Sequence, residues 1–311
     1  MENNIGKVAI LMATYNGGKY LKQQLNSILK QTYQNFVLFI SDDHSSDNTL
    51  DIIHDYEAVY PQKILLIKND HNVRGVKTNF ANLISYVKAN CLHDFDYFML
   101  SDQDDFWKSN KIAVSIQPLT YQQLPTLVHT DLTVVDQNLK LINRSFVKMS
   151  KISGFNHKLQ RLLVQNNVTG CTMVWNKALM KIIQPDFTKA IMHDWFIALI
   201  ANCSGQIIFI PQATVFYRQH KDNLVGIKNA LVDVTKKLSN FKQVKQSVNA
   251  TFIQAQFLKD NYNLNSQSTE ILNNYLNIMK HQHKIVRISI ILKNGYLQFG
   301  LIKILGEMVF I

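Results

Sequence analysis

Four short apolar stretches, separated by longer stretches of helical character, divide the first hundred residues. The sequence predicts buried strands at residues 8–14, 36–41, 64–67 and 97–101. Between them, apolar residues recur at helical spacing, as in Leu21, Leu25, Ile28 and Leu29, and again in Phe80, Leu83, Ile84 and Val87. Strands that alternate with helices favour an α/β fold with a mostly parallel sheet and right-handed crossovers.

The pattern becomes mixed after residue 105. We expect strands near 127–136, 171–175 and 206–217, and helices near 158–165, 177–184 and 195–202. Beyond residue 221 the chain is rich in lysine and asparagine, has no proline and reads as mainly helical. The sequence therefore predicts an α/β core of about 220 residues with a helical C-terminal extension.

The composition indicates a folded globule in a reducing compartment. Of 311 residues, 47% are hydrophobic and only 18% are charged, which argues against disorder. Cys91, Cys171 and Cys203 form no CxxC pair and are odd in number, so we expect buried thiols and no zinc site. The first residues lead directly into "VAILMAT", too early for a signal peptide.

Two apolar stretches resemble membrane segments, but we predict no span. Residues 195–217 are uncharged, yet they contain polar residues and Pro211 in their middle, which favours a helix, a turn and strands. In the tail 285–311, Lys293 and Lys303 interrupt the apolar run. That tail is expected either to lie on a membrane surface or to pack against the core or a partner.

Positive charge is concentrated in the last third of the chain. Residues 1–211 hold 20 basic and 17 acidic groups, a difference of +3, whereas residues 212–311 hold 13 and 5, a difference of +8. Such a segment suits an anionic membrane or a phospholipid-linked substrate, although a solvated helical face has the same composition. We expect no nucleic acid as partner, because no RNA-binding signature is present.

Acidic motifs follow two of the predicted strands, at the sheet edge where α/β proteins bind ligands. In "SDQDD" (101–105), a continuing strand would place Asp102 and Asp104 on one face, roughly 6–7 Å apart. Their repulsion, on the order of 3 kcal/mol at an effective dielectric of 20, would be relieved by Mg²⁺ or Mn²⁺. A solvated acidic turn is the alternative.

The other strand-end motif, "SDDHSSDNT" (41–49), has two parts. Its second half offers Asp47, Asn48 and Thr49 as caps for a following helix. That leaves Asp42 and Asp43 unexplained at the ligand edge, where a carboxylate suits the N3–H of a uracil or thymine ring.

Two further motifs contain residues suited to catalysis. Asp194 in "MHDWFIALIA" precedes an apolar helix and is either its N-cap or a general base. In "FYRQHKDN", Arg218 and His220 share a face of an extended segment. Arg218 is a natural diphosphate clamp, and His220 is either a structural residue or a metal or phosphate ligand.

Taken together, these motifs resemble the family 2 inverting glycosyltransferases of GT-A fold, and more narrowly the bacterial rhamnosyltransferases that build cell-wall rhamnan and other surface polysaccharides. The resemblance covers about residues 6–226 and rests on "ILMATYNGGKYLKQQLNSILKQTY", "FISDDHSSDNT", "NVRGVKTNF", "MLSDQDDFW", "HDW" and "YRQH". Processive synthases of this family carry QxxRW and several membrane spans. Here Gln219 follows Arg218, so we expect a non-processive enzyme.

The resemblance implies a role for each matching residue. It assigns Thr14 and Tyr15, with Asn16 beside them, to the nucleotide pocket, Asp43 to the pyrimidine, and Lys77 to the nucleotide or its phosphates. It makes Asp102-Gln103-Asp104 the DxD motif, with Asp104 as the direct metal ligand and Asp102 near the ribose and the metal. It places Arg218 and His220 in the segment that closes over the diphosphate and the metal. Asp194 becomes the catalytic base, with His193 in place of the family's usual glutamate.

The resemblance also implies the organisation and the reaction. Residues 1–105 would form the nucleotide-sugar-binding half, 106–225 the acceptor-binding and catalytic half, and 226–311 a basic segment for membrane or oligomer contact, including a homodimer. With Mn²⁺ or Mg²⁺ as cofactor, we expect transfer of L-rhamnose from dTDP-L-rhamnose to a lipid-linked glycan at the cytoplasmic face of the plasma membrane. The alternatives are a UDP-hexose donor on the same fold and a non-catalytic sugar-nucleotide- or glycan-binding subunit.

Overall fold

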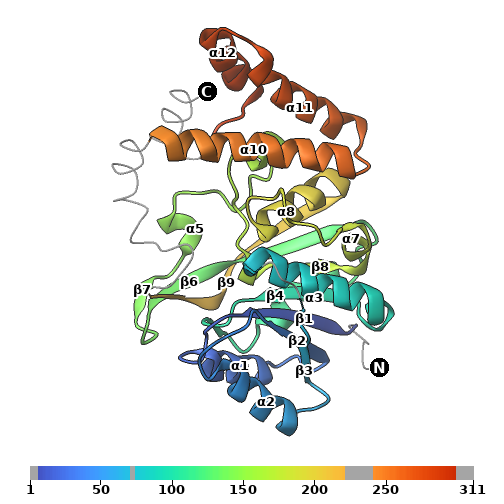
Figure 1. Ribbon diagram of the computed structural model, residues 1–311, viewed down its shortest axis with the longest axis vertical. Helices are drawn as coiled ribbons and strands as arrows, with labels where there is room; N and C mark the ends of the chain where they lie inside the picture. The colour runs from blue at the N-terminus through green and yellow to red at the C-terminus, as the bar shows by residue number, and fades with distance from the viewer. Residues whose placement is uncertain (1–5, 71–73, 221–240, 299–311) are drawn as a thin grey trace.

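A single mixed sheet organises the chain (Figure 1). The computed structural model describes residues 6–70, 74–220 and 241–298. Within these ranges the sheet has nine strands in the order β3-β2-β1-β4-β8-β6-β9-β5, with β7 paired to β6. The strands are β1 (Val8–Thr14), β2 (Phe36–Asp42), β3 (Ile64–Ile67), β4 (Tyr97–Ser101), β5 (Phe106–Trp107), β6 (Thr126–Asp136), β7 (Leu141–Asn143), β8 (Val174–Asn176) and β9 (Gln206–Gln219).

The first four strands confirm the predicted parallel half of the sheet. β1 lies between β2 and β4 and pairs in parallel with both, so that Val8 faces Phe36 on one side and Tyr97 on the other. These strands are apolar up to the polar residues at their carboxyl ends, because helices cover both of their faces. β8 then pairs antiparallel with β4 and with β6, and β9 returns parallel to β6. The sheet is therefore mixed in its second half.

Alternate residues of β1 enter two separate cores. Ala9 and Leu11 face α3 and α8, whereas Val8 and Ile10 face α1, α2 and α4. The helices are α1 (Leu21–Leu29), α2 (Thr49–Val59), α3 (Val76–Asn90), α4 (Lys111–Ile116), α5 (Phe146–Met149), α6 (Leu159–Val164), α7 (Lys177–Ile182), α8 (His193–Ser204), α10 (Phe241–Asn261), α11 (Ser266–Asn277) and α12 (Lys284–Asn294).

Aromatic contacts hold the C-terminal helices to the core. Phe196 of α8 packs against Phe257 of α10, with ring centroids 5.5 Å apart, and Phe252 stacks on Tyr275 of α11 at 4.4 Å. α10 to α12 form one end of the molecule, and α1 and α2 form the opposite end (Figure 1). No helix in the described ranges combines the length and apolar character needed to cross a membrane.

The sequence-based boundaries hold within a few residues, with one exception. The strand expected near 171–175 begins only at Val174, because residues Gly170–Thr172 form a turn of 3-10 helix. About half of the tail 285–311 is described, because its residues 299–311 lie outside the described ranges. The proposed boundary at residue 225 also lies outside them. The predicted boundary at residue 105 does not coincide with a break in the sheet. β4, which precedes this boundary, pairs directly with β8, which follows it. The division into three parts stays a prediction.

Candidate active site

The carboxyl ends of β1 and β2 place Thr14 beside the first acidic motif. The Thr14 hydroxyl donates a 2.8 Å hydrogen bond to Asp42 Oδ1, and Asp42 also accepts hydrogen bonds from the backbone and hydroxyl of Ser45. Asp42 thus holds the loop after β2. Asp43 is buried, and its Oδ2 accepts a 2.7 Å hydrogen bond from the Gly75 N–H. The pyrimidine-binding role assigned to Asp43 stays a prediction.

Tyr15 and Asn16 lie on an exposed turn after β1. The Tyr15 side chain is 51% exposed, and its backbone exchanges two 2.9 Å hydrogen bonds with the Gln103 side-chain amide. Asn16 has a φ of 46° and accepts a hydrogen bond from the Ser46 N–H. Gly17 leaves room for this contact, since a Cβ atom would lie 2.2 Å from Gln103 Oε1 and would displace that side chain. Gln103, the central residue of the predicted DxD motif, therefore ties that motif to the predicted nucleotide pocket.

The two aspartates of the DxD motif do not continue the strand. β4 ends at Ser101, so the predicted pairing of Asp102 and Asp104 on one strand face is wrong. Asp104 instead meets the end of β9, with its Oδ2 2.7 Å from His220 Nε2. The His220 ring also lies 5.0 Å from the ring of Tyr20. Asp104 of "SDQDD" and His220 of "FYRQHKDN", both predicted to bind the metal, are therefore adjacent.

Asp102 has a different neighbour, the fully buried Asp105. Oxygens of these two carboxylates and the Cys171 sulfur all lie within 4.8 Å of one another. Asp105 accepts a hydrogen bond from the Arg218 N–H through Oδ1, whereas its Oδ2 is buried with no partner. Burial, together with the charges of Asp104 and Asp194, raises the pKa of Asp102 to about 7. Asp102 and Asp194, predicted as metal ligand and base, thus belong to one electrostatic site.

Arg218 lies inside this cluster with most of its donors used. Its side chain is 1% exposed, and its guanidinium lies 4.5 Å from the centroid of the Tyr20 ring. It donates hydrogen bonds to the backbone oxygens of Asp104 and Gln137 and to Gln23 Oε1. These bonds fix the DxD loop to β9. The predicted role of Arg218 as diphosphate clamp stays a prediction.

Asp194 lies in the first turn of α8 rather than at its cap. The N-cap is Met192, so a purely capping role for Asp194 is wrong. Its Oδ2 accepts a 3.1 Å hydrogen bond from the Gly170 N–H, and its Oδ1 accepts one from Trp195. Burial raises the pKa of Asp194 to about 6. A carboxylate with a pKa near neutrality is suited to accept a proton.

His193, which stands where the family usually has glutamate, is a neutral core residue. Its ring stacks on Phe80 with centroids 4.2 Å apart. Burial, together with the charge of Lys77, lowers the pKa of His193 to about 3. Lys77 itself donates a 2.6 Å hydrogen bond to the Ala190 carbonyl. Lys77 therefore lies between α3 and the segment before α8, and its predicted contact with the nucleotide stays a prediction.

Lys111 is a further member of this site that the sequence did not reveal. It begins α4 and is fully buried. Burial lowers the pKa of Lys111 to about 8, a value that already includes the opposing effect of Cys171, Asp105 and Asp102. Its ammonium lies over the ring of Trp107, 4.6 Å from the ring centroid. The sequence did not indicate that Lys111 is buried, because a lysine at the start of a short helix is usually solvated. Its distance of six residues from Asp105 in the chain also matches no known motif.

The residues present fit a hard divalent cation. Asp102 and Asp104 offer carboxylate oxygens, His220 offers an imidazole nitrogen, and one oxygen of Asp105 is buried without a hydrogen-bond partner. Mg²⁺ and Mn²⁺ favour carboxylates and complete their shells with substrate phosphates. The expected cofactor is therefore compatible with the site.

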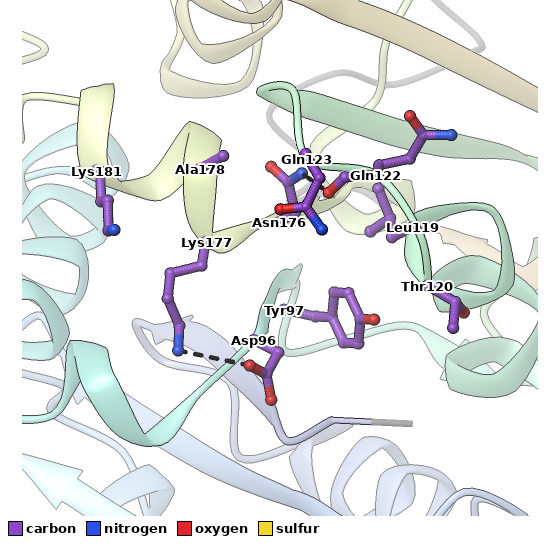
Figure 2. A pocket seen from close by; sticks show the side chains of 10 residues that line it. All are labelled: Asp96, Tyr97, Leu119, Thr120, Gln122, Gln123, Asn176, Lys177, Ala178 and Lys181. Carbon is purple, nitrogen blue, oxygen red and sulfur yellow. Dashed lines mark hydrogen bonds and ion pairs between the residues drawn. The ribbon is translucent and has the colours of Figure 1, made fainter. Parts of the chain in front are cut away.

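A cavity of about 350 Å³ lies at the other edge of the sheet (Figure 2). It is lined by Asp96 and Tyr97, which precede and begin β4, and by polar residues of β8 and α7. Lys177 Nζ lies 3.5 Å from Asp96 Oδ1 across it. Because this is the amino end of β4, the cavity is separate from the acidic site, and we assign no function to it.

Comparison with known proteins identifies the family. The sequence profile described as glycosyl transferase family 2 matches residues 9–182, more than half of the chain. The chain belongs to this family. It is also 30% identical over 223 residues to a dTDP-rhamnosyl transferase, RfbG of Shigella flexneri, an alignment that covers 69% of this chain and 73% of that protein. This glycosyltransferase is accordingly an enzyme, which disfavours the alternative of a non-catalytic binding subunit.

Solved structures confirm the GT-A fold. The Staphylococcus aureus TarS fragment 1–349 in complex with UDP-GlcNAc matches with a TM-score of 0.57 at 16% identity, over 93% of this chain and 80% of that one. The mannosyltransferase PcManGT of Pyrobaculum calidifontis, in complex with GDP-Man and Mn²⁺, matches with a TM-score of 0.56 at 11% identity, over 98% and 86%. At these identities the likeness concerns the fold alone.

The raised pKa of Asp194 predicts a pH-dependent stability difference. Because the folded-state pKa of about 6 lies above the ordinary value of 3.8, the ionised carboxylate opposes folding. Relative to Asp194→Asn, the wild type should lose stability as the pH rises from about 4 to about 6 and then level off. We expect the variant to be more stable by about 1–2 kcal/mol at pH 8, a value discounted for partial exposure.

Urea unfolding of both proteins between pH 4.5 and 8 measures this difference. Asp55→Asn, on the exposed face of α2, is the matched control for the loss of one carboxylate. A wild-type-to-Asp194→Asn difference that stays constant across this range would contradict the assigned pKa.

Proposed function

We propose that this glycosyltransferase transfers L-rhamnose from dTDP-L-rhamnose to a lipid-linked glycan, with inversion at the anomeric carbon and with dependence on Mn²⁺ or Mg²⁺. One observation carries the proposal: Asp104 Oδ2 lies 2.7 Å from His220 Nε2, so two residues predicted to bind the cation come together from distant parts of the chain. The charge of Asp194, the proposed base, also raises the pKa of Asp102 in the same loop. The 30% identity to the dTDP-rhamnosyl transferase of Shigella flexneri supports rhamnose as the sugar.

In the proposed mechanism, Asp194 takes the proton from an acceptor hydroxyl as that oxygen attacks the anomeric carbon. The new carbon–oxygen bond forms while the bond to the diphosphate breaks on the opposite face, so the configuration inverts. The transition state resembles an oxocarbenium ion, as in other glycosyl transfers. A cation bound by Asp104 and His220, with Asp102 nearby, would stabilise the charge that develops on the departing diphosphate.

The proposed base pocket does not distinguish thymine from uracil. Thr14, Tyr15 and Asn16 would line its pocket, and Asp43 would accept the N3–H that uracil and thymine share. A UDP-hexose therefore remains the alternative donor, and the TarS complex with UDP-GlcNAc supports it as a use of the same fold.

The acceptor would be presented at the inner face of the plasma membrane. α12 carries Lys284, Arg287 and Lys293, while Ile285 and Leu292 are 82% and 52% exposed. Apolar side chains beside cations suit the surface of an anionic bilayer. α12 lies at the end of the molecule away from α1 and α2 (Figure 1). A second copy of the chain is the other proposed occupant of this surface.

The roles of Asp104 and Asp194 are tested by replacing each carboxylate with an amide. Asp104→Asn and Asp194→Asn should each lower turnover by about a hundredfold or more, because one weakens the cation site and the other removes the base. Turnover is measured as transfer of radiolabelled sugar to membrane extracts, and circular dichroism checks the fold. Asp55→Asn is the control. Near-normal transfer by either variant would remove the role assigned to that residue.

The donor is tested by thermal unfolding with dTDP-, UDP- and GDP-sugars, each with Mn²⁺, Mg²⁺ or EDTA. A ligand at a hundredfold excess over its dissociation constant should stabilise the fold by roughly 2.7 kcal/mol. We expect the largest metal-dependent shift with dTDP-rhamnose. A larger shift with a UDP-sugar would replace the donor but keep the mechanism.

Membrane binding is tested by sedimentation with lipid vesicles. We expect the protein to sediment with vesicles containing phosphatidylglycerol and not with pure phosphatidylcholine, because α12 is basic. Lys284→Glu combined with Lys293→Glu should abolish sedimentation. The same exchange at Lys22 and Lys30, on exposed positions of and next to α1, should have no effect. Equal binding by both double variants would exclude α12 as the membrane contact.

A further inference from the structure

The ring of Tyr20 contacts two site residues at the end of β9. Its centroid lies 5.0 Å from the centroid of the His220 ring and 4.5 Å from the guanidinium carbon of Arg218. Tyr20 is 8% exposed and is the N-cap of α1, shortly after the turn that follows β1. One aromatic ring thus joins the start of α1 to the end of β9.

Two kinds of attraction act between these three side chains. The negative face of an aromatic ring attracts a guanidinium, and the attraction is stronger where solvent is excluded, as it is around the buried Arg218. The rings of Tyr20 and His220 are tilted by 37° and pack as an aromatic pair. The His220 side chain is only 10% exposed, so this packing restricts the orientation of its imidazole.

The hydroxyl of Tyr20 takes no part in these contacts. It is buried and has no hydrogen-bond partner among the residues that the structure describes. A buried hydroxyl without a partner lowers the stability of a fold. In the structure, the contribution of Tyr20 to the site therefore comes from its ring.

The next turn of α1 extends the contact to both sides of the site. Gln23 Oε1 accepts a 2.8 Å hydrogen bond from Arg218. Gln24 is fully buried, and its side-chain amide donates hydrogen bonds of 2.9 Å to Ser101 Oγ and 3.1 Å to the Asp102 carbonyl. Residues three and four positions further along a helix share its face. One side of α1 therefore holds both the loop after β4 and the end of β9.

We propose that Tyr20 is a positioning residue for the cation site: its ring holds the His220 imidazole and the Arg218 guanidinium in place, so that His220 Nε2 meets Asp104. The inference rests on the metal dependence stated under Proposed function. A ligand that is already ordered binds a cation without first losing side-chain freedom. Without the ring, the cation itself would have to order His220, so the affinity for the cation would fall.

Three variants separate positioning from packing. Tyr20→Leu removes the ring and keeps an apolar side chain, whereas Tyr20→Phe keeps the ring and removes only the hydroxyl. Leu25→Ala, at a fully buried position of the same helix, is the matched control for lost packing, since Leu25 belongs to the core beneath α1. If Tyr20 only packed, Tyr20→Leu would lower the melting temperature and leave the affinity for a cation unchanged.

The experiment measures the melting temperature in EDTA and the dissociation constant of Mn²⁺, from the electron paramagnetic resonance signal of the free ion. We expect Tyr20→Leu to bind Mn²⁺ about tenfold more weakly, as when a group that orients a metal ligand is lost, and Tyr20→Phe to stay within about twofold of wild type. Leu25→Ala should melt lower and bind Mn²⁺ as the wild type does.

A double variant tests whether the ring acts through His220. Once the imidazole is removed, the ring has no ligand to position, so Tyr20→Leu combined with His220→Ala should bind Mn²⁺ as weakly as His220→Ala alone. Additive losses would contradict the proposal. If Tyr20→Leu does not fold, Tyr20→Met, which keeps more of the side-chain volume, replaces it with the same expectation.

Two results would overturn the inference by itself while the proposed metal dependence stands. One is wild-type Mn²⁺ affinity in Tyr20→Leu. The other is a loss of affinity in Tyr20→Phe as large as in Tyr20→Leu, which would assign the effect to the hydroxyl. If the wild type itself bound no Mn²⁺, the proposed metal dependence would fail, and this inference would fail with it.

Discussion

The contact between the end of β4 and the end of β9 is the interaction on which the site depends. Asp104 lies 2.7 Å from His220, and Asp105 accepts a hydrogen bond from the backbone of Arg218. β4 lies in the middle of the sheet, whereas β9 reaches it only after the chain has passed through α8. This contact therefore holds the loop after β4 to the C-terminal end of β9.

The same contact concentrates negative charge in a place with little solvent. Asp102 responds to the charges of both Asp104 and Asp194, and its pKa is raised to about 7. Such a cluster is stable only when cations surround it. Arg218 supplies one from the end of β9. In the proposed enzyme, a divalent ion and the diphosphate would complete the balance of charge.

Family membership and donor identity rest on different parts of the chain. The fold persists at 16% identity to TarS because buried strands tolerate exchange among apolar residues of similar size. In the proposed enzyme, a few side chains at the edge of the sheet would choose the donor. There Asp43 accepts a hydrogen bond from the Gly75 N–H, and the Tyr15 backbone bonds to Gln103, so these residues lie on loops held by their own hydrogen bonds.

The sequence by itself determined the parallel half of the sheet, its helices and the edge at which the polar residues gather. It could do so because burial on both faces requires unbroken apolar strands, and a helix requires its own period. Only the tertiary structure decided how the side chains at that edge are paired. Asp102 lies with Asp105 rather than with Asp104, because β4 ends at Ser101 and the alternation of a strand ends with it. The contact of Tyr20 with His220, the engaged donors of Arg218 and the bond from Gly170 to Asp194 all join residues distant in the chain, and no local pattern records such contacts.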